Sequence, residues 1–487
     1  MSVPAVVIAA PASGSGKTTV ATGLIGALRG AGHRVAPFKV GPDYIDPGYH
    51  GLAAGRPGRN LDPVLVGMER VVPLYRHGAQ GCDLAVVEGV MGLFDGRIDE
   101  NQAGPIAAGS TAQVAGLLGA PVILVVDARG HSQSLAALLH GFATFDSTIG
   151  LGGVILNRVG SERHDHVLRA ACDRVGLPVL GSLPRMSELE VPSRHLGLIP
   201  AVEHGAAATA AVDAMTDLVA AHVDLRAIAS LAHTTVAGPI WDPAMELRAH
   251  SAAHTTIESL PRGGADTSRV AEACTEKPEF APVIAIAGGP AFTFGYAEHR
   301  ELLIAAGAQV VVFDPLHDEL PTGTAGLVLP GGFPEEHAAD LAANTLLLAQ
   351  VAEQTGRGMP VHAECAGLLY LTRSLDGHAM AGVVDATAEF GPRLTLGYRD
   401  AVALNDSPLW RAGERVSGHE FHRTRLVATG PDTPAWGWHA GGERIREGAL
   451  VHRVHASYLH THPAGNPRAV ARFVAAAAEY THTRATT

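Results

Sequence analysis

The stretch that most constrains the fold is "VVIAAPASGSGKTTVATGL" near the start of the chain. An apolar, strand-like run leads into a loop of small residues, and Gly16-Lys17-Thr18-Thr19 then opens a helix-like run. This order is that of a phosphate-binding loop (P-loop), in which backbone N–H groups and a helix N-terminus hold phosphates. In such a loop the lysine reaches the terminal phosphates and the first threonine ligates magnesium. Pro11 stands where the usual pattern has glycine, so a turn without a ligand is the alternative.

Short, almost continuously apolar runs alternate with helix-like stretches over residues 1–222, which is typical of parallel strands buried on both faces. These runs are "AVVIAA", "RVAPFKV", "LAVVEGV", "PVILVVDA", "GGVILN" and "LPVLGSLP". A second series, "APVIAIAGG", "AQVVVFDP", "AGLVLPGG" and "MPVHAEC", falls in residues 282–480. We therefore predict two doubly wound α/β domains. Residues 223–281 are rich in His, Thr, Ser, Gly and Pro and are predicted to be a boundary and linker.

Composition limits the classes of protein to consider. A length of 487 residues exceeds one typical core, and 47% hydrophobic with 17% charged residues indicates a globular chain. The net charge of −12 argues against nucleic-acid binding, which needs a basic surface. No apolar run approaches the roughly 18 residues of a membrane span. The scattered cysteines favour neither a zinc site nor a disulfide framework, so we expect a cytoplasmic protein.

Acidic residues follow two of the predicted strands. "PFKVGPDYIDPGYH" ends a strand with Lys39 and then offers Asp43 and Asp46, while "LAVVEGVMGLFDG" ends a strand with Glu88 and continues to Asp95. The carboxyl ends of parallel strands face the crevice where doubly wound sheets bind ligands. Carboxylates there hold magnesium beside a P-loop threonine. Each acid could alternatively be a solvated loop residue or a helix cap.

Cys365 stands where the strand-like "GMPVHAE" gives way to the helix-like "AGLLYLTRSL". Cysteine is often a small core residue. A strand-to-helix turn, however, exposes a side chain at the edge of a sheet, and the helix N-terminus lowers a thiol pKa. The Gly331-Gly332 turn could supply backbone N–H groups to an oxyanion. We expect the activating base from one late strand that carries His452, His455, His460 and His462.

Two sets of motifs resemble known families. "LPGGFPEE", "HAECAGLLYL" and "ASYLHTH" resemble the class I glutamine amidotransferase domain, which has a flavodoxin-like sheet. "GPDYIDPGYH", "VVEGVMGLFDG" and "PSRHLGLIPA" resemble the cobyrinic acid and hydrogenobyrinic acid a,c-diamide synthase family. The resemblance covers nearly the whole chain except residues 225–280. It implies a P-loop domain of the dethiobiotin synthetase type and two ATP-dependent amidations of corrin carboxylates, with nitrogen from L-glutamine.

In the amidotransferase part, the resemblance makes Cys365 the nucleophile that forms a glutamyl thioester. His460 matches the base that raises its nucleophilicity, and the backbone of Gly332 and Ala366 matches the oxyanion donors. Many relatives have an acid two residues after this histidine, where the present chain has His462. The resemblance therefore implies that the site works either as a Cys–His dyad or with a group from another part of the chain that orients His460.

In the P-loop part, the resemblance implies ATP as co-substrate and Mg²⁺ as cofactor. The matching ATP-binding residues are Ser13, Gly14, Ser15, Gly16, Lys17, Thr18, Thr19, Lys39 and Asn157, the last reading the adenine edge. Thr18, Asp43 and Glu88 match the metal site, and Asp46 and Asp95 fit the side that holds the corrin carboxylate.

Three alternatives stay open at this point. The first is an amidotransferase of the adenosylcobyric acid synthase type, against which the "GPDYIDP" loop argues. The second is a partition-type P-loop ATPase, which would not need a domain with Cys365 and His460. The third is a hydrolase or binding module with a vestigial P-loop. The residues do not indicate whether the corrin carries cobalt, which carboxylate reacts first or the oligomeric state.

Overall fold

The computed structural model describes residues 3–98, 104–185, 193–194, 197–198, 200–233, 236–249, 281–427 and 433–486. The chain divides into two compact units, Met1–Trp241 and Asp242–Thr487. Of the predicted linker, residues 234–235 and 250–280 lie outside the described residues. Helix α10 (Leu225–Leu231) and a helical stretch over 243–249 occupy parts of the remainder.

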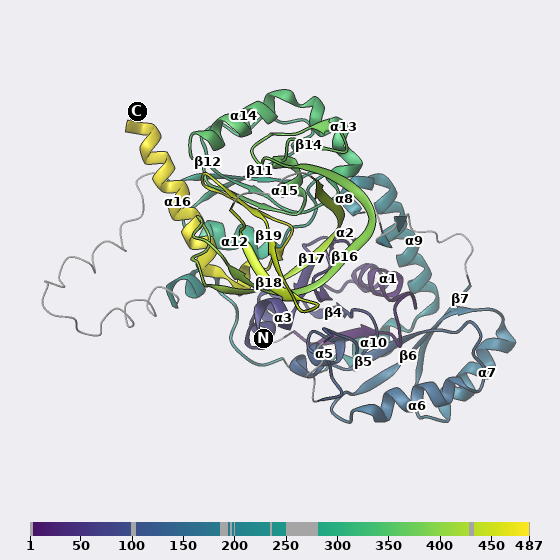
Figure 1. The fold of residues 1–487 in the computed structure, drawn as a ribbon. Helices are drawn as coiled ribbons and strands as arrows, with labels where there is room; N and C mark the ends of the chain where they lie inside the picture. Colours follow the sequence, from purple (N-terminus) through teal and green to yellow (C-terminus); the bar gives the residue numbers. More distant parts are fainter. Residues whose placement is uncertain are drawn as a thin grey trace, which may run out of the picture. The chain divides into compact units, whose positions relative to one another are not determined.

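The first unit is built on a seven-stranded sheet in the order β3-β2-β4-β1-β5-β6-β7, in which every pairing is parallel (Figure 1). The strands are β1 (Ala5–Ala9), β2 (Val35–Val40), β3 (Arg59–Leu61), β4 (Leu84–Glu88), β5 (Val122–Asp127), β6 (Leu151–Val159) and β7 (Val179–Pro184). Each predicted apolar run forms one of these strands, which confirms the doubly wound fold. Because the chain moves from β1 to one side and later to the other, the loop after β1 lies at the point where such sheets bind ligands.

The helices of this unit up to His222 are α1 (Lys17–Gly30), α2 (Asp46–Ala54), α3 (Pro63–Val66), α4 (Met68–Gly78), α5 (Thr111–Leu118), α6 (Leu135–Phe145), α7 (Glu162–Asp173), α8 (Ala201–His204) and α9 (Ala206–His222). Helices α1 to α7 connect successive strands of this sheet, and α8 and α9 follow its last strand. Helix α1 packs against α2 and α9, whereas α4 packs against α5 and α6 against α7. A short antiparallel pair, β8 (Ser193–Arg194) and β9 (Gly197–Leu198), precedes α8. Among the helices of the described residues, none has the length and apolar character of a membrane span.

The second unit contains a six-stranded sheet in the order β11-β10-β12-β13-β21-β20, parallel except for the last pair. Its strands are β10 (Val283–Ala287), β11 (Gln309–Phe313), β12 (Thr324–Leu329), β13 (Val361–Glu364), β20 (Ala449–Val451) and β21 (Val454–Ser457). Its helices are α12 (Ala297–Ala305), α13 (Ala338–Ala343), α14 (Thr345–Gly356), α15 (Ala366–Leu371) and α16 (Pro467–Thr486), with 3₁₀ turns η1 (Pro334–His337) and η2 (Pro463–Gly465). The α/β series predicted for this half is confirmed.

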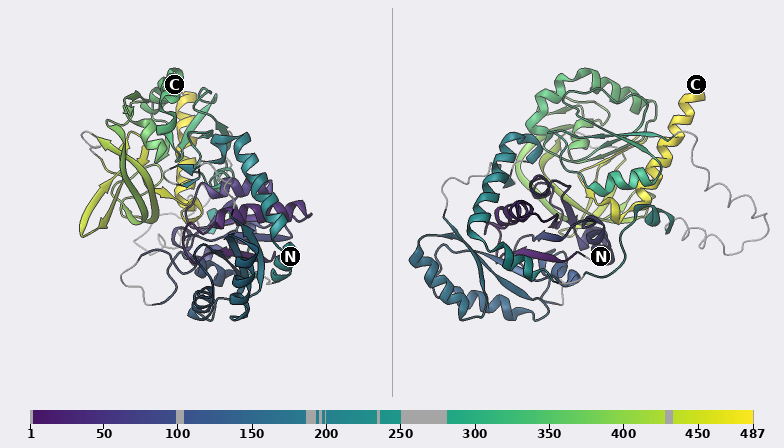
Figure 2. Two further views of the ribbon diagram at one scale, coloured as in Figure 1. Left: turned by 90° about the vertical axis from the view of Figure 1, so that its right-hand side faces the viewer. Right: turned by 180° about the vertical axis from the view of Figure 1, so that it is seen from behind.

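A second sheet in the same unit was not predicted (Figure 2). It consists of β14 (Ser374–Leu375), β15 (His378–Ala379), β16 (Thr387–Ala403), β17 (Arg415–Val427), β18 (Trp436–Ala440), β19 (Glu443–Glu447) and β22 (His460–Thr461). Its two long strands, β16 and β17, pair in antiparallel fashion, and their sequences are rich in charged and polar residues. Prediction from apolar runs overlooks such strands because their stability comes from pairing over a long register.

Helix α1 approaches α9 closely at Gly23. A Cβ atom added to Gly23 would lie 2.3 Å from the Met215 carbonyl oxygen and 2.6 Å from a methyl carbon of Val219. The helix that carries the P-loop lysine is therefore held in place by a contact that only glycine permits.

We expect Gly23→Ala to lower the free energy of unfolding of the first unit by about 1–3 kcal/mol, because overpacking forces the two helices apart. Thermal unfolding followed by circular dichroism measures this loss. Gly30→Ala is the matched control, since a Cβ at Gly30 of the same helix meets nothing within 4 Å. Equal stability of the two variants would contradict the close packing of α1 on α9.

Candidate active sites

The P-loop joins β1 to α1 as predicted from the sequence. Gly14 and Gly16 adopt positive φ angles of 77° and 96°, a region that favours glycine. The Asn157 side chain at the end of β6 donates a hydrogen bond of 2.9 Å to the Ser15 carbonyl oxygen. A Cβ on Gly16 would lie 2.2 Å from Asn157 Nδ2. The loop therefore closes around this amide, so that Asn157 lies beside the P-loop, and its role at the adenine edge stays a prediction.

Lys17 is the first residue of α1 and is largely buried. Its ammonium group donates a hydrogen bond of 2.5 Å to the carbonyl oxygen of Met91, which has a positive φ of 46°. Burial, followed by the charge of Lys39, lowers the pKa of Lys17. Ser13 is exposed in the loop and Thr19 lies in the first turn of α1. Met91 could not be predicted from the sequence, because its contact depends on the path of the loop after β4.

A cluster of charged groups stands at the carboxyl ends of β2 and β4. The Thr18 hydroxyl donates to Glu88 Oε1 at 2.7 Å and lies 3.2 Å from Asp46 Oδ2. The buried Lys39 ammonium lies 2.5 Å from Asp46 Oδ2 and 2.8 Å from Glu88 Oε1. Asp43 Oδ2 is farther from this ammonium, at 3.9 Å. The structure thus brings all five predicted residues together, with Asp46 in closer contact with Lys39 than Asp43.

Burial alone would lower the pKa of Lys39, but the charges of Asp46 and Glu88 outweigh burial and raise it. Burial also raises the pKa of Asp46, and the charges of Asp43 and Glu88 add to this. For Glu88 burial acts in the same direction, but Lys39 and His50 hold its pKa well below the ordinary value. Glu88 is therefore the firmly ionised carboxylate of the cluster.

His50 was not singled out from the sequence. Its side chain is fully buried on α2, and its Nε2 atom lies 2.6 Å from Glu88 Oε2. The signal was present, because His50 follows Asp46 by four residues and such a pair shares one face of a helix. The two residues thus contact the cluster from neighbouring turns of α2.

Asp43 and Asp95 both make local turn contacts. Asp43 Oδ1 accepts hydrogen bonds from the backbone N–H groups of Ile45 and Asp46 at 2.8 and 2.9 Å. Asp95 Oδ2 accepts one from the backbone N–H group of Gly92 at 2.9 Å. Each acid therefore has a role in its own loop besides any role in binding.

The oxygen atoms of Thr18, Glu88 and the two neighbouring aspartates are the hard ligands that Mg²⁺ prefers. Within the described part of the chain, no three His, Cys, Asp or Glu side chains form a group that could hold a metal by themselves. Mg²⁺ usually takes one or two protein ligands and completes its shell with phosphate oxygens and water. The residues present fit an ion held in that way.

In the second unit, Cys365 forms the turn between β13 and α15. Its backbone has φ 49° and ψ −99°, a conformation that costs free energy in a residue with a side chain and is found at nucleophile turns. The Cys365 N–H group donates to the Ser457 carbonyl oxygen of β21 at 2.7 Å. Its thiol lies 3.8 Å from the Phe421 carbonyl oxygen of β17. The predicted strand-to-helix turn is therefore present.

Burial raises the pKa of the Cys365 thiol, and the charge of Glu335 adds to this. The backbone N–H groups of Ala366 and Gly332 act in the opposite direction and favour the thiolate. We expected a lowered pKa at the helix N-terminus, but burial outweighs it here. The thiol therefore needs a base, while both expected oxyanion donors reach it.

His460 lies on β22 and is fully buried. A Cβ on Gly331 would come 2.3 Å from its Cε1 atom, so the imidazole ring packs directly on the turn that contains Gly332. Burial lowers the pKa of His460 to about 4, although the charge of Glu364 opposes this effect. A neutral imidazole at pH 7 is able to accept the proton of a thiol.

The late histidines do not share one strand. His455 lies on β21 in the parallel sheet, whereas His460 lies on β22 in the second sheet. His452 is in the turn between β20 and β21, and His462 caps η2 by accepting from the backbone N–H group of Ala464. One strand was expected because the histidines follow one another closely. The chain instead changes sheet after Ser457.

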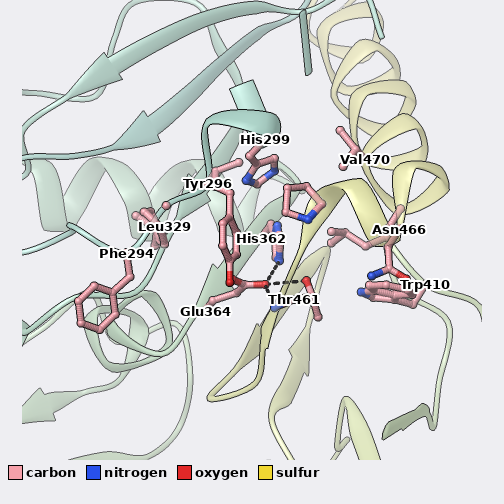
Figure 3. A pocket seen from close by; sticks show the side chains of 16 residues that line it. Phe294, Tyr296, His299, Leu329, His362, Glu364, Trp410, Thr461, Asn466 and Val470 are labelled. Carbon is pink, nitrogen blue, oxygen red and sulfur yellow. Dashed lines mark hydrogen bonds and ion pairs between the residues drawn. The ribbon is translucent and has the colours of Figure 1, made fainter. Parts of the chain in front are cut away.

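Glu364, the residue before Cys365, was also missed. Its Oε2 atom lies 3.8 Å from His460 Nδ1, and its Oε1 atom accepts from the backbone and hydroxyl groups of Thr461 at 3.0 and 2.9 Å. Glu364 lines a small cavity of about 30 Å³, and Figure 3 shows its carboxylate linked to His362 and Thr461. The available signal was the "HAEC" sequence itself, in which an acid directly precedes the cysteine.

Among the described cysteines, Cys82, Cys172 and Cys365 are free thiols, and Cys274 lies outside the described residues. Of these three described thiols, only that of Cys365 lies at the turn between a strand and a helix with two backbone donors at its sulfur. This arrangement distinguishes it from a structural thiol.

Comparisons with known proteins match each of the two units to a known domain. The CobQ/CobB/MinD/ParA nucleotide binding domain matches residues 6–199, and the CobB/CobQ-like glutamine amidotransferase domain matches residues 283–467. Hydrogenobyrinate a,c-diamide synthase of Mycobacterium tuberculosis (strain ATCC 25618 / H37Rv) is 60% identical over 98% of this chain and 99% of its own length. The Streptomyces coelicolor protein of that name is 55% identical over 97% of each chain. Cobyrinate a,c-diamide synthase of a Synechococcus strain is 38% identical over 98% and 99%.

We expect His50→Ala to weaken the activation of ATP binding by Mg²⁺ about 10- to 100-fold, because Glu88 loses the group that orients it. Calorimetric titration of ATP at increasing Mg²⁺ concentration measures the change. His140→Ala, at an exposed position of α6, is the control. An unchanged Mg²⁺ dependence in folded His50→Ala would assign His50 to the core alone.

Proposed function

The chain belongs to the family of hydrogenobyrinate and cobyrinate a,c-diamide synthases, and on this premise we propose that its substrate is hydrogenobyrinate. The enzyme would convert the a- and c-carboxylates into amides with ATP and glutamine. We propose hydrogenobyrinate, the metal-free corrin, over cobyrinate because of the names of the relatives. Those at 60%, 55% and 50% identity are named for hydrogenobyrinate, whereas those named for cobyrinate match at 38% and 40%.

One observation carries the proposal. A single chain holds a P-loop with a cluster of carboxylates and also a cysteine turn with a buried histidine. A partition-type ATPase would have no use for the second site, and a simple hydrolase would have none for the first. Amide formation from a carboxylate uses both, because the acid must be activated and ammonia must be supplied.

Activation of the carboxylate is assigned to the first unit. A carboxylate does not react with ammonia at neutral pH, since its leaving group would be oxide. Transfer of the γ-phosphoryl group of ATP to the carboxylate oxygen gives an acyl phosphate, whose leaving group is phosphate. Lys17 and Lys39 stabilise the negative charge of that transfer. Asp46 and Asp95 are assigned to the corrin side of this site.

Thr18, Glu88 and Asp43 would hold Mg²⁺, with Asp46 next to them. The bound ion supplies positive charge to the phosphate oxygens. Lys39 keeps the two buried carboxylates Asp46 and Glu88 paired, and His50 fixes the second oxygen of Glu88. The chain is acidic overall, so these local cations are needed to attract an anionic nucleotide and a corrin that carries several carboxylates.

The release of ammonia from glutamine is assigned to the second unit. The Cys365 thiol gives its proton to His460, and the sulfur attacks the side-chain carbonyl carbon of glutamine. The backbone N–H groups of Gly332 and Ala366 stabilise the oxyanion. His460 returns the proton to the nitrogen as the C–N bond breaks, ammonia leaves, and water then hydrolyses the glutamyl thioester. Ammonia attacks the acyl phosphate and displaces phosphate.

Mass spectrometry tests the function directly. The enzyme is incubated with ATP, Mg²⁺ and glutamine and with either hydrogenobyrinate or cobyrinate. We expect two successive gains of one amide, with glutamate and ADP formed in step, and faster conversion of hydrogenobyrinate. Conversion of neither substrate, but of a corrin already amidated at a and c, would instead indicate the adenosylcobyric acid synthase type.

We expect Cys365→Ser to abolish amidation with glutamine and to leave amidation with ammonium salts at raised pH near the wild-type rate. The reason is that the first unit needs only ammonia, whatever its source. Initial rates with each nitrogen donor measure the effect. Cys172→Ser, at a buried thiol of α7, is the control. Equal loss with both donors would return Cys365 to a structural role.

Lys17→Ala should abolish amidation with either nitrogen donor, because the acyl phosphate no longer forms. Glutamine hydrolysis measured without the corrin should continue, since its groups lie in the other unit. The assay compares ADP release, diamide formation and glutamate release for the purified, folded variant. Normal amidation by Lys17→Ala would place the nucleotide elsewhere.

A further inference from the structure

The predicted base, His460, is not followed by the acid that many relatives carry two residues later. Position 462, two residues after His460, is a histidine. Its Nδ1 atom accepts a hydrogen bond of 3.2 Å from the backbone N–H group of Ala464, and its ring lies 4.1 Å from that of Tyr296. His462 is therefore engaged in capping η2 and in an aromatic contact.

We propose that Glu364, the residue directly before the nucleophile, is the positioning residue that holds His460 for proton transfer. This inference rests on the proposed hydrolysis of glutamine at Cys365. Glu364 does not touch the reacting atoms in this scheme. It would act through the imidazole ring, by fixing its orientation and by stabilising the imidazolium ion that forms when the thiol is deprotonated.

The strand pairing places Glu364 correctly. Strands β13 and β21 run parallel with Glu364 opposite Ser457, and β22 begins three residues farther on, at His460. An acid at the carboxyl end of β13 therefore faces the residues that follow β21. The carboxylate reaches both residues of β22, because Oε2 lies 3.8 Å from His460 Nδ1 while Oε1 accepts the N–H and hydroxyl groups of Thr461.

A third contact of the Glu364 carboxylate comes from His362 of the same strand. His362 precedes Glu364 by two residues on β13, so their side chains share one face of the strand. His362 Nε2 lies 3.2 Å from Glu364 Oε1, and a dashed line joins the two side chains in Figure 3. With Thr461 and His362 on one oxygen, the other oxygen is directed towards His460. The rotamer of Glu364 is thereby determined by three groups.

The charge state of Glu364 suits this role. Burial alone would raise its pKa, but His362, followed by His460 and Thr461, holds the pKa at about 2. The carboxylate is therefore ionised at neutral pH. Its negative charge also raises the pKa of His460 against the effect of burial, which makes the imidazole a better proton acceptor than burial alone would allow.

The test is Glu364→Gln, which preserves size and removes the charge. We expect kcat for glutamine hydrolysis to fall about tenfold or more, with KM for glutamine within about twofold of the wild-type value, because a positioning residue acts on the transition state and not on binding. Ammonia-dependent amidation should be unchanged. Glu389→Gln, an exposed acid of β16 in the same unit, is the matched control and should behave as wild type.

A folded Glu364→Gln variant with wild-type kcat, or with a raised KM and unchanged kcat, would overturn the proposal. If this variant does not fold, Glu364→Asp serves instead, since it keeps the charge but withdraws it from His460; wild-type kcat in Glu364→Asp would overturn the proposal equally. Glutamine hydrolysis by the wild-type enzyme distinguishes failure of the proposed function from failure of the role proposed for Glu364. Its absence refutes the proposed function, whereas its presence with an unaffected variant refutes only the role of Glu364.

Discussion

In both units the candidate site begins at the carboxyl ends of parallel strands: Glu88 ends β4, and Cys365 directly follows β13, although His460 comes from β22 of the second sheet. Parallel pairing makes this unavoidable, because strands that run in the same direction release their chains at the same edge of the sheet. The register of β1 with β4 brings Ile8 opposite Glu88, and that of β13 with β21 brings Glu364 opposite Ser457. Residues far apart in the sequence thus meet without any long loop having to position them.

Burial at these edges determines the electrostatics of both sites. The Lys39 ammonium is held between two carboxylates, since an isolated buried charge would be too costly. Removing one partner of such a cluster leaves an uncompensated buried charge. The resulting loss of folding stability is larger than the small net contribution of the intact ion pair. At the other site burial disfavours the thiolate of Cys365 and also the protonated form of His460. Both groups therefore rest neutral, and the charge separates only when the proton is transferred.

Most of the fold could be predicted from the sequence because buried parallel strands are continuous apolar runs that end at recognisable residues. Lys39, Glu88 and Cys365 were found in this way, because Lys39 and Glu88 lie at the ends of β2 and β4 and Cys365 directly follows β13. Met91 was missed because its contact with Lys17 depends on the path of the loop after β4. His50 and Glu364 stand at telling positions, four residues after Asp46 and directly before Cys365, but their partners Glu88 and His460 come from other segments, which spacing alone does not identify. The second sheet was missed for a related reason, since its polar strands are stabilised by long antiparallel pairing.

Strand β17 links the open part of the second sheet to both groups of the thiol chemistry. On one side it pairs with β16 along a long register, and on the other it pairs with β22, where His419 lies opposite His460. Its Phe421 carbonyl oxygen also lies beside the Cys365 sulfur. Sliding of β17 along its own axis would therefore shift the acceptor of the thiol and the neighbour of the base in one movement. Because β17 also pairs with β16, a displacement of β16 would be passed on to the surroundings of both Cys365 and His460.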